Sequence, residues 1–324
     1  MKLTIFTPTY NRKELLKRAY DSLRAQTCKD FCWLIVDDGS TDDTASAVEE
    51  WGREGIIPIE YLYFENGGKM RAHNRGVENC RTEWFLCLDS DDRLVPDAVE
   101  EILRFADSLD VSKPTGSPDT MAGGREEGIL ADSLDVSNPT GSPDTAVGGS
   151  IAGIIAHKGR SDTELLSGVG FPKGVERSTL YGLYLKGFKG ETTLVFRTDV
   201  LRRYPFPEIE GEKYVPEDYI YDKIDAEYEY IVLDRILTVC ELISEGYTDS
   251  VRRLKEDNKQ AWYLYYEQRA RITPMSLLKL KYLGFYRLYA GMSGHALKEA
   301  DGISVWDKIL GIPGEMILKL TGKI

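Results

Sequence analysis

Strand-like and helix-like patterns alternate through the first hundred or so residues of this chain. Apolar runs typical of strands lie at 2–10, 31–40, 59–66 and 83–92. Amphipathic segments follow them, at 12–25, 41–52, 69–79 and 95–109. Strands that alternate with helices of this length predict parallel βαβ units. We therefore expect an α/β fold with a doubly wound, mostly parallel central sheet flanked by helices.

Acidic residues stand where two of these strands are predicted to end. Asp37 and Asp38 lie at the end of the second run, and Asp89, Asp91 and Asp92 lie at the end of the fourth. Ligands of such sheets bind beyond the carboxyl ends of the strands, so these acids are expected at one edge. Like charges at the end of a buried strand repel each other and lose hydration. The cluster at 89–92 therefore predicts a bound or neighbouring cation.

The spacing of the second cluster suggests how a cation is held. Side chains at i and i+2 of an extended strand point the same way, so Asp89 and Asp91 are predicted to converge, with Asp92 left to the turn. Carboxylate oxygens favour Mg²⁺ or Mn²⁺ over zinc. The alternative is that these acids cap the next helix or lie solvated in a turn.

Three further segments carry groups suited to a nucleotide or to acid–base chemistry. The stretch "FTPTYNR" ends the first strand and offers backbone groups and the Tyr10 ring to a base. In "ENGGKMRAHNRG" a Gly-Gly turn precedes Lys69 and Arg71 at a helix start, which suits a diphosphate. In "VPEDY", Glu217 and Asp218 are candidates for a general base, or they stabilise a helix start.

In this order and spacing, "TPTYNR", "VDDGS", "NGGKMRAHNRG", "LDSDD" and "VPEDY" resemble the family 2 glycosyltransferases of GT-A fold, of the bacterial capsule, wall or exopolysaccharide type. The resemblance is strong over residues 1–100 and looser over 151–245. It implies that "DSD" is the D-x-D motif, with Asp89 and Asp91 holding Mn²⁺ or Mg²⁺. It also implies a nucleotide-sugar site, which we assign to Pro8, Thr9, Tyr10, Arg12, Asp38, Asn66, Lys69, Arg71, Asp89 and Ser90.

The resemblance further implies a metal-dependent, inverting transfer of a sugar from a nucleoside-diphosphate sugar, with uridine as the expected base, to a hydroxyl of a glycan or lipid-linked acceptor. It favours Asp218 as the base, while Glu217 stays open. A Gln-x-x-Arg-Trp motif is absent from the sequence, which favours the addition of one or a few sugars. The alternatives are a haloacid-dehalogenase-like metal-dependent phosphatase and an inactive nucleotide- or glycan-binding relative.

A near-identical repeat divides the predicted catalytic domain. Residues 106–120 and 131–145 are identical at fourteen of fifteen positions and are rich in Ser, Pro, Gly and Asp. This composition predicts a surface insertion, with a functional lid or partner-binding loop as the alternative. The predicted organisation is a glycosyltransferase domain over 1–245, made of a nucleotide-sugar half (1–105), a flexible duplicated loop (106–150) and an acceptor half (151–245), followed by a helical extension over 246–324.

Charge is distributed unevenly along the chain. The net charge is −12, which argues against binding to nucleic acid. Residues 275–324 hold seven Lys and Arg against four Asp and Glu, a net charge of +3, so residues 1–274 carry −15. The tail at 304–324 reads as two short amphipathic pieces broken by Pro313 and Gly314. It is either a core-packing tail or an anchor at an anionic membrane surface.

Several features predict a cytoplasmic protein, placed at the inner face of the plasma membrane if the tail is an anchor. The N-terminus lacks a signal-peptide pattern, and no apolar run approaches roughly 18 residues. Five cysteines at scattered positions are expected to be reduced thiols. The three histidines, His73, His157 and His295, show no ligand pattern, and we expect core or surface roles for them.

Overall fold

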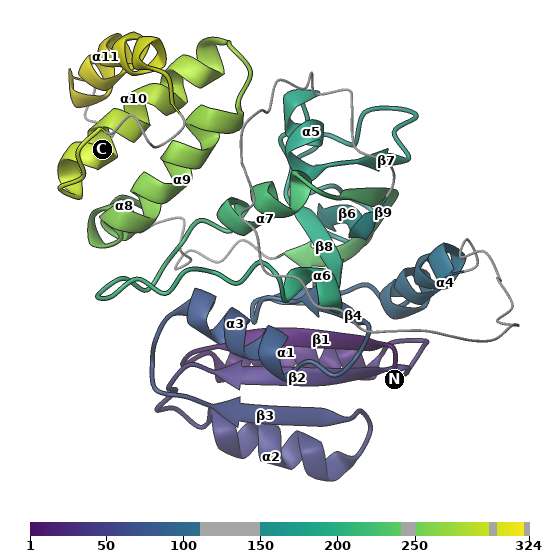
Figure 1. Cartoon of the computed structure of the whole chain (residues 1–324). Helices are drawn as coiled ribbons and strands as arrows, with labels where there is room; N and C mark the ends of the chain where they lie inside the picture. The colour runs from purple at the N-terminus through teal and green to yellow at the C-terminus, as the bar shows by residue number, and fades with distance from the viewer. Residues whose placement is uncertain (111–149, 241–250, 298–302, 321–324) are drawn as a thin grey trace, which may run out of the picture.

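A computed structural model describes residues 1–110, 150–240, 251–297 and 303–320 of the 324-residue chain (Figure 1). The N-terminal part alternates strands and helices as predicted: Leu3–Thr9 (β1), Lys13–Arg24 (α1), Phe31–Asp37 (β2), Thr44–Glu54 (α2), Ile59–Tyr63 (β3), Lys69–Asn79 (α3) and Trp84–Cys87 (β4). These four strands are parallel and lie in the order β3-β2-β1-β4.

The sheet continues with strands of mixed direction. The remaining elements before the C-terminal helices are Asp92–Leu94 (β5), Ala98–Asp110 (α4), Ile151–Gly159 (β6), Arg177–Ser178 (β7), Leu180–Leu185 (α5), Thr192–Arg197 (β8), Thr198–Leu201 (α6), Asp218–Asp225 (α7) and Glu229–Cys240 (β9). Strand β8 is antiparallel to both β4 and β6, whereas β6 and β9 are parallel. The predicted α/β fold is confirmed, with a sheet that is parallel throughout only in its N-terminal half.

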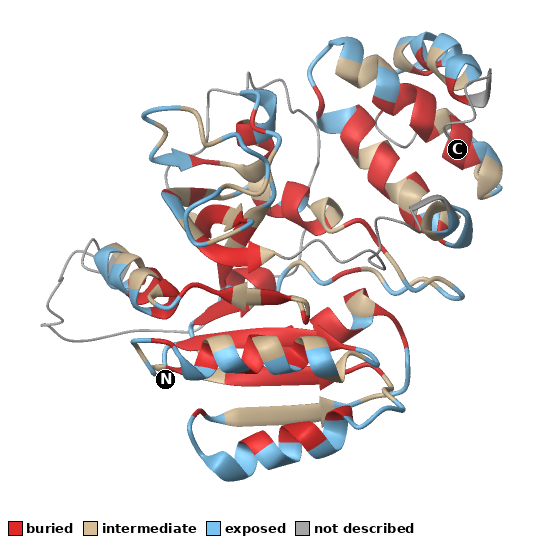
Figure 2. Cartoon of the chain, turned by 180° about the vertical axis from the view of Figure 1, so that it is seen from behind, coloured by how far each residue is buried: buried red, intermediate tan, exposed pale blue. Residues whose placement is uncertain are grey.

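Two apolar layers cover the faces of the sheet. Successive strand residues point to opposite faces, so Ile5 of β1 packs with α1, α2 and α4, while Phe6 packs with α3 and α7. Tyr20 of α1 stacks on Trp51 of α2 with ring centroids 4.8 Å apart. Every residue of β1 is buried, and Figure 2 shows the buried strands between helices whose outer sides are exposed. This core fixes the edge at which the parallel strands end.

The acidic segment after β4 is a turn and not the end of a strand. Leu88 donates the last ladder bond, 2.8 Å to the Phe6 carbonyl, and the Asp92 amide then donates 3.0 Å to the Asp89 carbonyl. Asp92 begins β5, is 5% exposed and pairs with Cys240 of β9. The predicted i, i+2 strand geometry of Asp89 and Asp91 is therefore wrong, as is the placement of Asp92 in the turn. The cause is that the chain turns at 89–91, because β4 before the turn pairs with β1 and β5 after it pairs with the distant strand β9.

The duplicated segment lies almost wholly outside the described residues. Its first residues, 106–110, belong to α4, and Ala106 is buried. Helix α4 continues through Asp110, so the predicted insertion cannot begin at 106. The predicted flexible loop and its lid alternative concern residues 111–149, which are not described.

Four helices form the C-terminal part: Val251–Asp257 (α8), Lys259–Ile272 (α9), Leu277–Met292 (α10) and Val305–Leu320 (α11). The helical extension predicted over 246–324 is interrupted at Asn258, between α8 and α9. The Asn258 side-chain oxygen accepts hydrogen bonds from the amides of Lys213 and Tyr214, at 2.9 and 3.0 Å. Asn258 therefore joins these helices to the sheet-bearing part of the chain.

The last helix differs from its prediction. Pro313 removes the hydrogen bond that would reach the carbonyl of Ile309, yet α11 is a single helix with Pro313 inside it. Ion pairs to α10 hold it on both sides of the proline, through Asp307 before it and Glu315 after it. The predicted break at 313–314 is thus wrong, because packing on α10 holds the helix together. Within the described residues, no helix combines the length and apolar character needed to span a membrane.

Candidate functional site

The predicted site residues gather where β1, β2 and β4 end. The Asp38 amide donates to the Thr9 carbonyl at 2.9 Å, which joins the ends of β1 and β2. Arg12, just after β1, lies 3.3 Å from the Asp91 carboxylate in the turn after β4. The sheet edge thus brings together three segments that the sequence singled out separately.

Asp38 organises the Gly-Gly turn before α3. Its two carboxylate oxygens accept hydrogen bonds from the amides of Gly67 and Gly68, each at 2.8 Å, and from the Asn66 side chain at 3.1 Å. Burial raises the pKa of Asp38, and the two amide bonds oppose that rise. Gly68 has φ +95°, and a Cβ there would lie 2.1 Å from the Lys213 carbonyl oxygen, so a side chain cannot be accommodated. The turn that precedes Lys69 is therefore fixed by hydrogen bonds to the buried Asp38 carboxylate.

Lys69 connects the two halves of the site. Its ammonium lies 2.8 Å from Asp89 and 2.7 Å from Glu217, at the N-terminus of α7. Burial alone would raise the pKa of Asp89, but Lys69 and then Lys158 outweigh it and lower that pKa to about 2. The D-x-D turn and the Glu-Asp pair, far apart in sequence, thus share one cation.

Lys158 is a site residue that sequence reasoning missed. It is the last residue but one of β6, lies 2.9 Å from Asp92 and 3.9 Å from Asp89, and its side chain is 16% exposed. A lysine at the end of the otherwise apolar run "SIAGIIAHKG" was the signal that could have found it, because lysine is rarely buried without a partner. Together with Lys69 and Arg12 it balances the charges of Asp89 and Asp91 in the turn and of Asp92 in β5.

The other predicted nucleotide-site residues lie around this edge. Pro8 and Thr9 are buried in β1, and the Thr9 hydroxyl has no hydrogen-bond partner in the part of the chain that the structure describes. Tyr10 is 48% exposed, and Ser90 is buried in the turn. Arg71 forms its ion pair with Glu208, at 3.2 Å, and so lies outside the group around Asp89.

An arginine from the C-terminal helices holds the predicted base. Arg269 of α9 lies 2.9 Å from Asp218 and 2.8 Å from Asp222, and it is 5% exposed. Its guanidinium also stacks over the Tyr181 ring at 4.1 Å. Burial raises the pKa of Asp218, while Arg269 opposes the rise. Sequence reasoning missed Arg269, because nothing in a helix that far along the chain indicates which carboxylate it meets.

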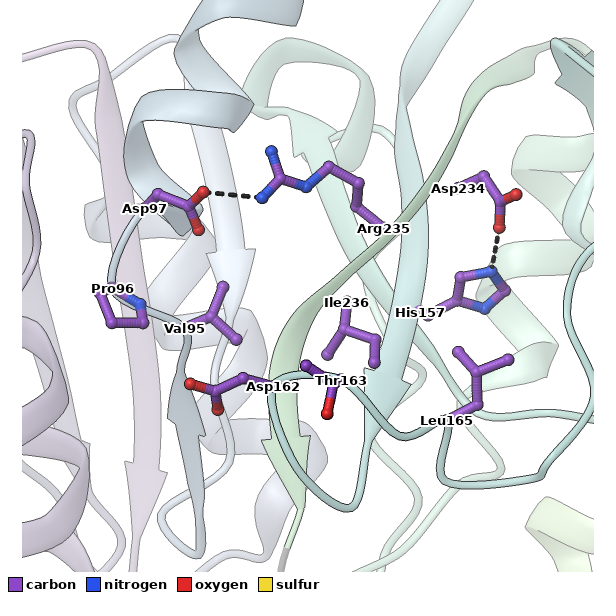
Figure 3. A pocket seen from close by; sticks show the side chains of 10 residues that line it. All are labelled: Val95, Pro96, Asp97, His157, Asp162, Thr163, Leu165, Asp234, Arg235 and Ile236. Atoms are coloured by element: carbon purple, nitrogen blue, oxygen red, sulfur yellow. Dashed lines mark hydrogen bonds and ion pairs between the residues drawn. The ribbon is translucent and has the colours of Figure 1, made fainter.

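A pocket of about 400 Å³ is lined by the segment between β5 and α4, by β9, and by the end of β6 with the segment that follows it (Figure 3). His157 projects toward it and pairs with Asp234 at 2.8 Å, while Arg235 pairs with Asp97 at 2.7 Å. His157 also stacks on Phe171, with ring centroids 3.7 Å apart. It is therefore a buried residue, as expected, that also contacts the Asp234 carboxylate. The described residues that line this pocket include none of the predicted site residues.

The sequence was compared with models of known protein families. Residues 4–131 match the family described as Glycosyl transferase family 2. The chain carries a family 2 glycosyltransferase domain. The matched span includes β1 to α4 and the D-x-D turn, so the resemblance predicted from the motifs is confirmed.

Curated relatives of the glycosyltransferase domain are bacterial. An uncharacterized glycosyltransferase of Rickettsia prowazekii is 35% identical over 108 residues, which is 33% of either chain. The GalNAc(5)-diNAcBac-PP-undecaprenol beta-1,3-glucosyltransferase of Campylobacter jejuni is 32% identical over 110 residues, which is 32% of this chain and 34% of that protein. The aligned stretch therefore spans about a third of these relatives.

Solved structures share the fold over nearly the whole chain. Residues 1–349 of S. aureus TarS in complex with UDP-GlcNAc give a TM-score of 0.57 at 16% identity, covering 98% of this chain and 81% of that one. A mannosyltransferase from Pyrobaculum calidifontis in complex with GDP-Man and Mn²⁺ gives 0.55 at 17% identity, covering 98% and 80%. The GT-A fold class predicted from the sequence agrees with these likenesses.

Proposed function

We propose that this protein is a metal-dependent, inverting glycosyltransferase that moves a sugar from a nucleoside-diphosphate sugar, with UDP-sugar as the expected donor, to a hydroxyl of a glycan or lipid-linked acceptor. The observation that carries the proposal is the position of Lys69 between Asp89 and Glu217, which joins the D-x-D turn to the base candidates. The TarS and mannosyltransferase complexes, with their nucleotide sugars, support a donor of this class. The Campylobacter relative, whose name includes an undecaprenol-linked glycan, supports the acceptor class.

The chemistry of the D-x-D turn fits a divalent cation. Asp89 and Asp91 offer hard oxygen donors on one turn, and the low pKa of Asp89 keeps it ionised at neutral pH. These two residues would hold Mg²⁺ or Mn²⁺ together with oxygens of the donor diphosphate. When bound, the ion would stabilise negative charge that develops on the departing diphosphate. Lys69 and Arg12, which pair with Asp89 and Asp91, would then be available to pair with phosphate oxygens.

We assign the nucleoside to the ends of β1 and β2. The exposed Tyr10 ring is available for stacking on a base, and the buried Thr9 hydroxyl, which lacks a partner among the described residues, can bond to a polar group of the nucleotide. Asp38 accepts hydrogen bonds from the Gly67 and Gly68 amides and so fixes the turn that leads into α3. Asn66, Arg71 and Ser90 complete the proposed donor site.

We assign the general base to Asp218 and keep Glu217 as its competitor. Asp218 has a half-exposed carboxylate at the N-terminus of α7, where an acceptor hydroxyl can approach. Its raised pKa favours proton uptake, and Arg269 orients it without competing for the proton, because a guanidinium does not deprotonate in proteins. Glu217 is held by Lys69 instead. A base of this kind, acting without a covalent intermediate, inverts the anomeric configuration.

We also propose that the protein works in the cytoplasm. All five cysteines are free thiols, which suits a reducing compartment.

Calorimetry of nucleotide binding tests the proposed function. We expect UDP to bind in the presence of Mn²⁺, to bind far more weakly with a chelator, and to lose metal-dependent binding in Asp91→Ala. The control is Asp162→Ala, a surface aspartate paired with Arg93 outside the site. If neither UDP nor another nucleoside diphosphate bound with or without the metal, the glycosyltransferase proposal would fail.

A further inference from the structure

Helix α11 exposes its apolar face and turns its charged face toward the protein, the reverse of an ordinary surface helix. Such helices bury an apolar stripe and expose their charges. In α11 one stripe faces the protein: Asp307, Lys308, Gly311, Gly314, Glu315 and Leu318. The opposite stripe is apolar and between 40% and 76% exposed: Val305, Trp306, Ile309, Leu310, Ile312, Met316 and Ile317.

Contacts with α10 fix this orientation. Asp307 pairs with Lys279 at 3.6 Å, and Glu315 pairs with Arg287 at 2.8 Å, with all four side chains no more than 20% exposed. The helices also meet at glycines: a Cβ on Gly284 would lie 2.8 Å from the carbonyl carbon of Gly314. Rotation of α11 would break both ion pairs and separate this contact. The contacts with α10 therefore fix the apolar stripe of α11 on the outside of the molecule.

A second apolar group lies at the same end of the molecule. Ile272 at the end of α9, Met275 in the connection and Leu277 at the start of α10 are 40%, 62% and 86% exposed. Figures 1 and 2 both place this connection and α11 at the top of the molecule, at the end opposite α2. We call the exposed residues of α11 and of this connection the apolar end. An exposed apolar surface of this extent marks a contact with another molecule or with a membrane.

Charge distinguishes the candidate partners. Helices α10 and α11 together carry five Lys and Arg against two Asp and Glu, a net charge of +3, while the rest of the chain carries −15. A second copy docked on this end would set like charge against like charge. An anionic lipid surface has the opposite charge to α10 and α11. It would attract these two helices and repel the acidic rest of the chain, which orients the apolar end toward the membrane.

The composition of the apolar end also favours lipid. Over residues 305–318, the part of α11 whose exposure the structure describes, the exposed stripe has no charged side chain, whereas protein interfaces carry a polar rim and about one hydrogen bond per 100–200 Å². Trp306, at the first turn of α11, is 76% exposed, and tryptophan is enriched at the membrane–water boundary. We propose that the apolar end docks on an anionic membrane surface, with α11 lying in the plane of the interface. This proposal does not depend on the proposed transfer reaction.

Vesicle binding by the full chain tests the docking. We expect the protein to sediment with vesicles of phosphatidylcholine and phosphatidylglycerol, to bind vesicles of phosphatidylcholine alone more weakly, and to bind less as salt is raised. Ile317→Glu, at a position 59% exposed, should lower the partition coefficient at least ~10-fold, because a charge replaces an inserted apolar side chain. The matched control is Val169→Glu, 50% exposed and away from the C-terminal helices, which should bind as the unmodified protein does.

Tryptophan fluorescence gives an independent readout. Emission should shift to shorter wavelength when vesicles are added, and Trp306→Phe should abolish the shift. Equal vesicle binding by Ile317→Glu and the unmodified protein, or no binding to anionic vesicles, would overturn the proposal. So would self-association of the unmodified protein without lipid that Ile317→Glu abolishes, because a second copy would then cover the apolar end. UDP binding by each variant, measured in parallel, keeps failure of docking distinct from misfolding or failure of the proposed function.

Discussion

The two halves of the candidate site balance their acids differently. On the proposed donor side, Asp89, Asp91 and Asp92 face three cations, Lys69, Lys158 and Arg12. On the proposed acceptor side, Asp218 and Asp222 share one arginine, Arg269. The donor acids are therefore neutralised by cations that a ligand can take over, whereas the acceptor acids are left with a deficit of positive charge.

The pKa values of the two sides reflect this difference. The lysines lower the pKa of Asp89 to about 2, whereas burial raises the pKa of Asp222 to about 7 against the opposing effect of Arg269. Ionised acids suit the binding of a cation and a diphosphate, while acids with raised pKa suit proton transfer. The same residue type is thus suited to two different purposes, according to the number of neighbouring cations.

The largest expected effect comes from removing a donor-side carboxylate. Asp89→Asn should lower kcat/KM by about a thousand-fold, because charge stabilisation on the departing diphosphate would be lost. Initial rates with UDP-sugar and Mn²⁺, compared with Asp162→Asn as the control, provide the measurement. A loss no greater than that of the control would place the charge stabilisation elsewhere.

Replacement of the base should separate chemistry from donor binding. Asp218→Asn should lower kcat by about 100- to 1,000-fold while leaving UDP affinity unchanged, since proton transfer is lost and the donor residues are intact. Glu217→Gln is the matched comparison. If Glu217→Gln abolished turnover and Asp218→Asn did not, the role of base would pass to Glu217.

Arg269 should affect turnover less than Asp218 and should act through it. Arg269→Met should lower kcat about 10- to 100-fold and move the acidic limb of the kcat/KM profile to higher pH, because Arg269 opposes the raised pKa of Asp218. Loss of this buried cation should also cost about 3–5 kcal/mol of stability. Arg269→Lys should restore part of the profile. An unshifted profile in a folded Arg269→Met protein would show that Arg269 does not tune the base.

The smallest effect on turnover is expected at His73, which packs against Phe6, Phe85 and Phe206 behind the donor side. Burial lowers the pKa of His73 to about 4, and neither ring nitrogen has a partner among the described residues. The unfolded chain binds this proton first as pH falls from about 6.5 to 4, so stability should decrease by on the order of 3 kcal/mol over that range.

In His73→Leu that part of the pH dependence should vanish, and stability at pH 7 should stay equal or rise by about 1 kcal/mol. Urea unfolding at several pH values measures both effects. An unchanged pH dependence in the variant would assign the acid sensitivity to other groups.

Features carried by contiguous residues could be predicted from the sequence. The alternation of strands and helices, the edge to which Asp38 and Asp89 belong, and the helix start at Asp218 are all local patterns, and the structure reproduces them. The β8 strand and the antiparallel second half of the sheet left no local pattern of direction, because a strand's direction depends on its partners.

Pairings between distant segments could not be predicted. Lys158 meets Asp92, and Arg269 meets Asp218, only after the sheet and the C-terminal helices are assembled. The amphipathic pattern of α11 was visible in the sequence, but which side faces the protein depends on Lys279, Arg287 and Gly284 of another helix. Sequence periodicity shows that two faces differ, and packing decides which one is inside.

The ion pair between Arg269 and Asp218 has a consequence for how this chain can be divided. A fragment that ended after β9 would keep every motif of the family and the whole central sheet. It would also lose the only cation that the described structure places against the proposed base. We therefore expect a fragment that is active in the proposed transfer to extend at least through α9, beyond the boundary at residue 245 that the motifs suggest.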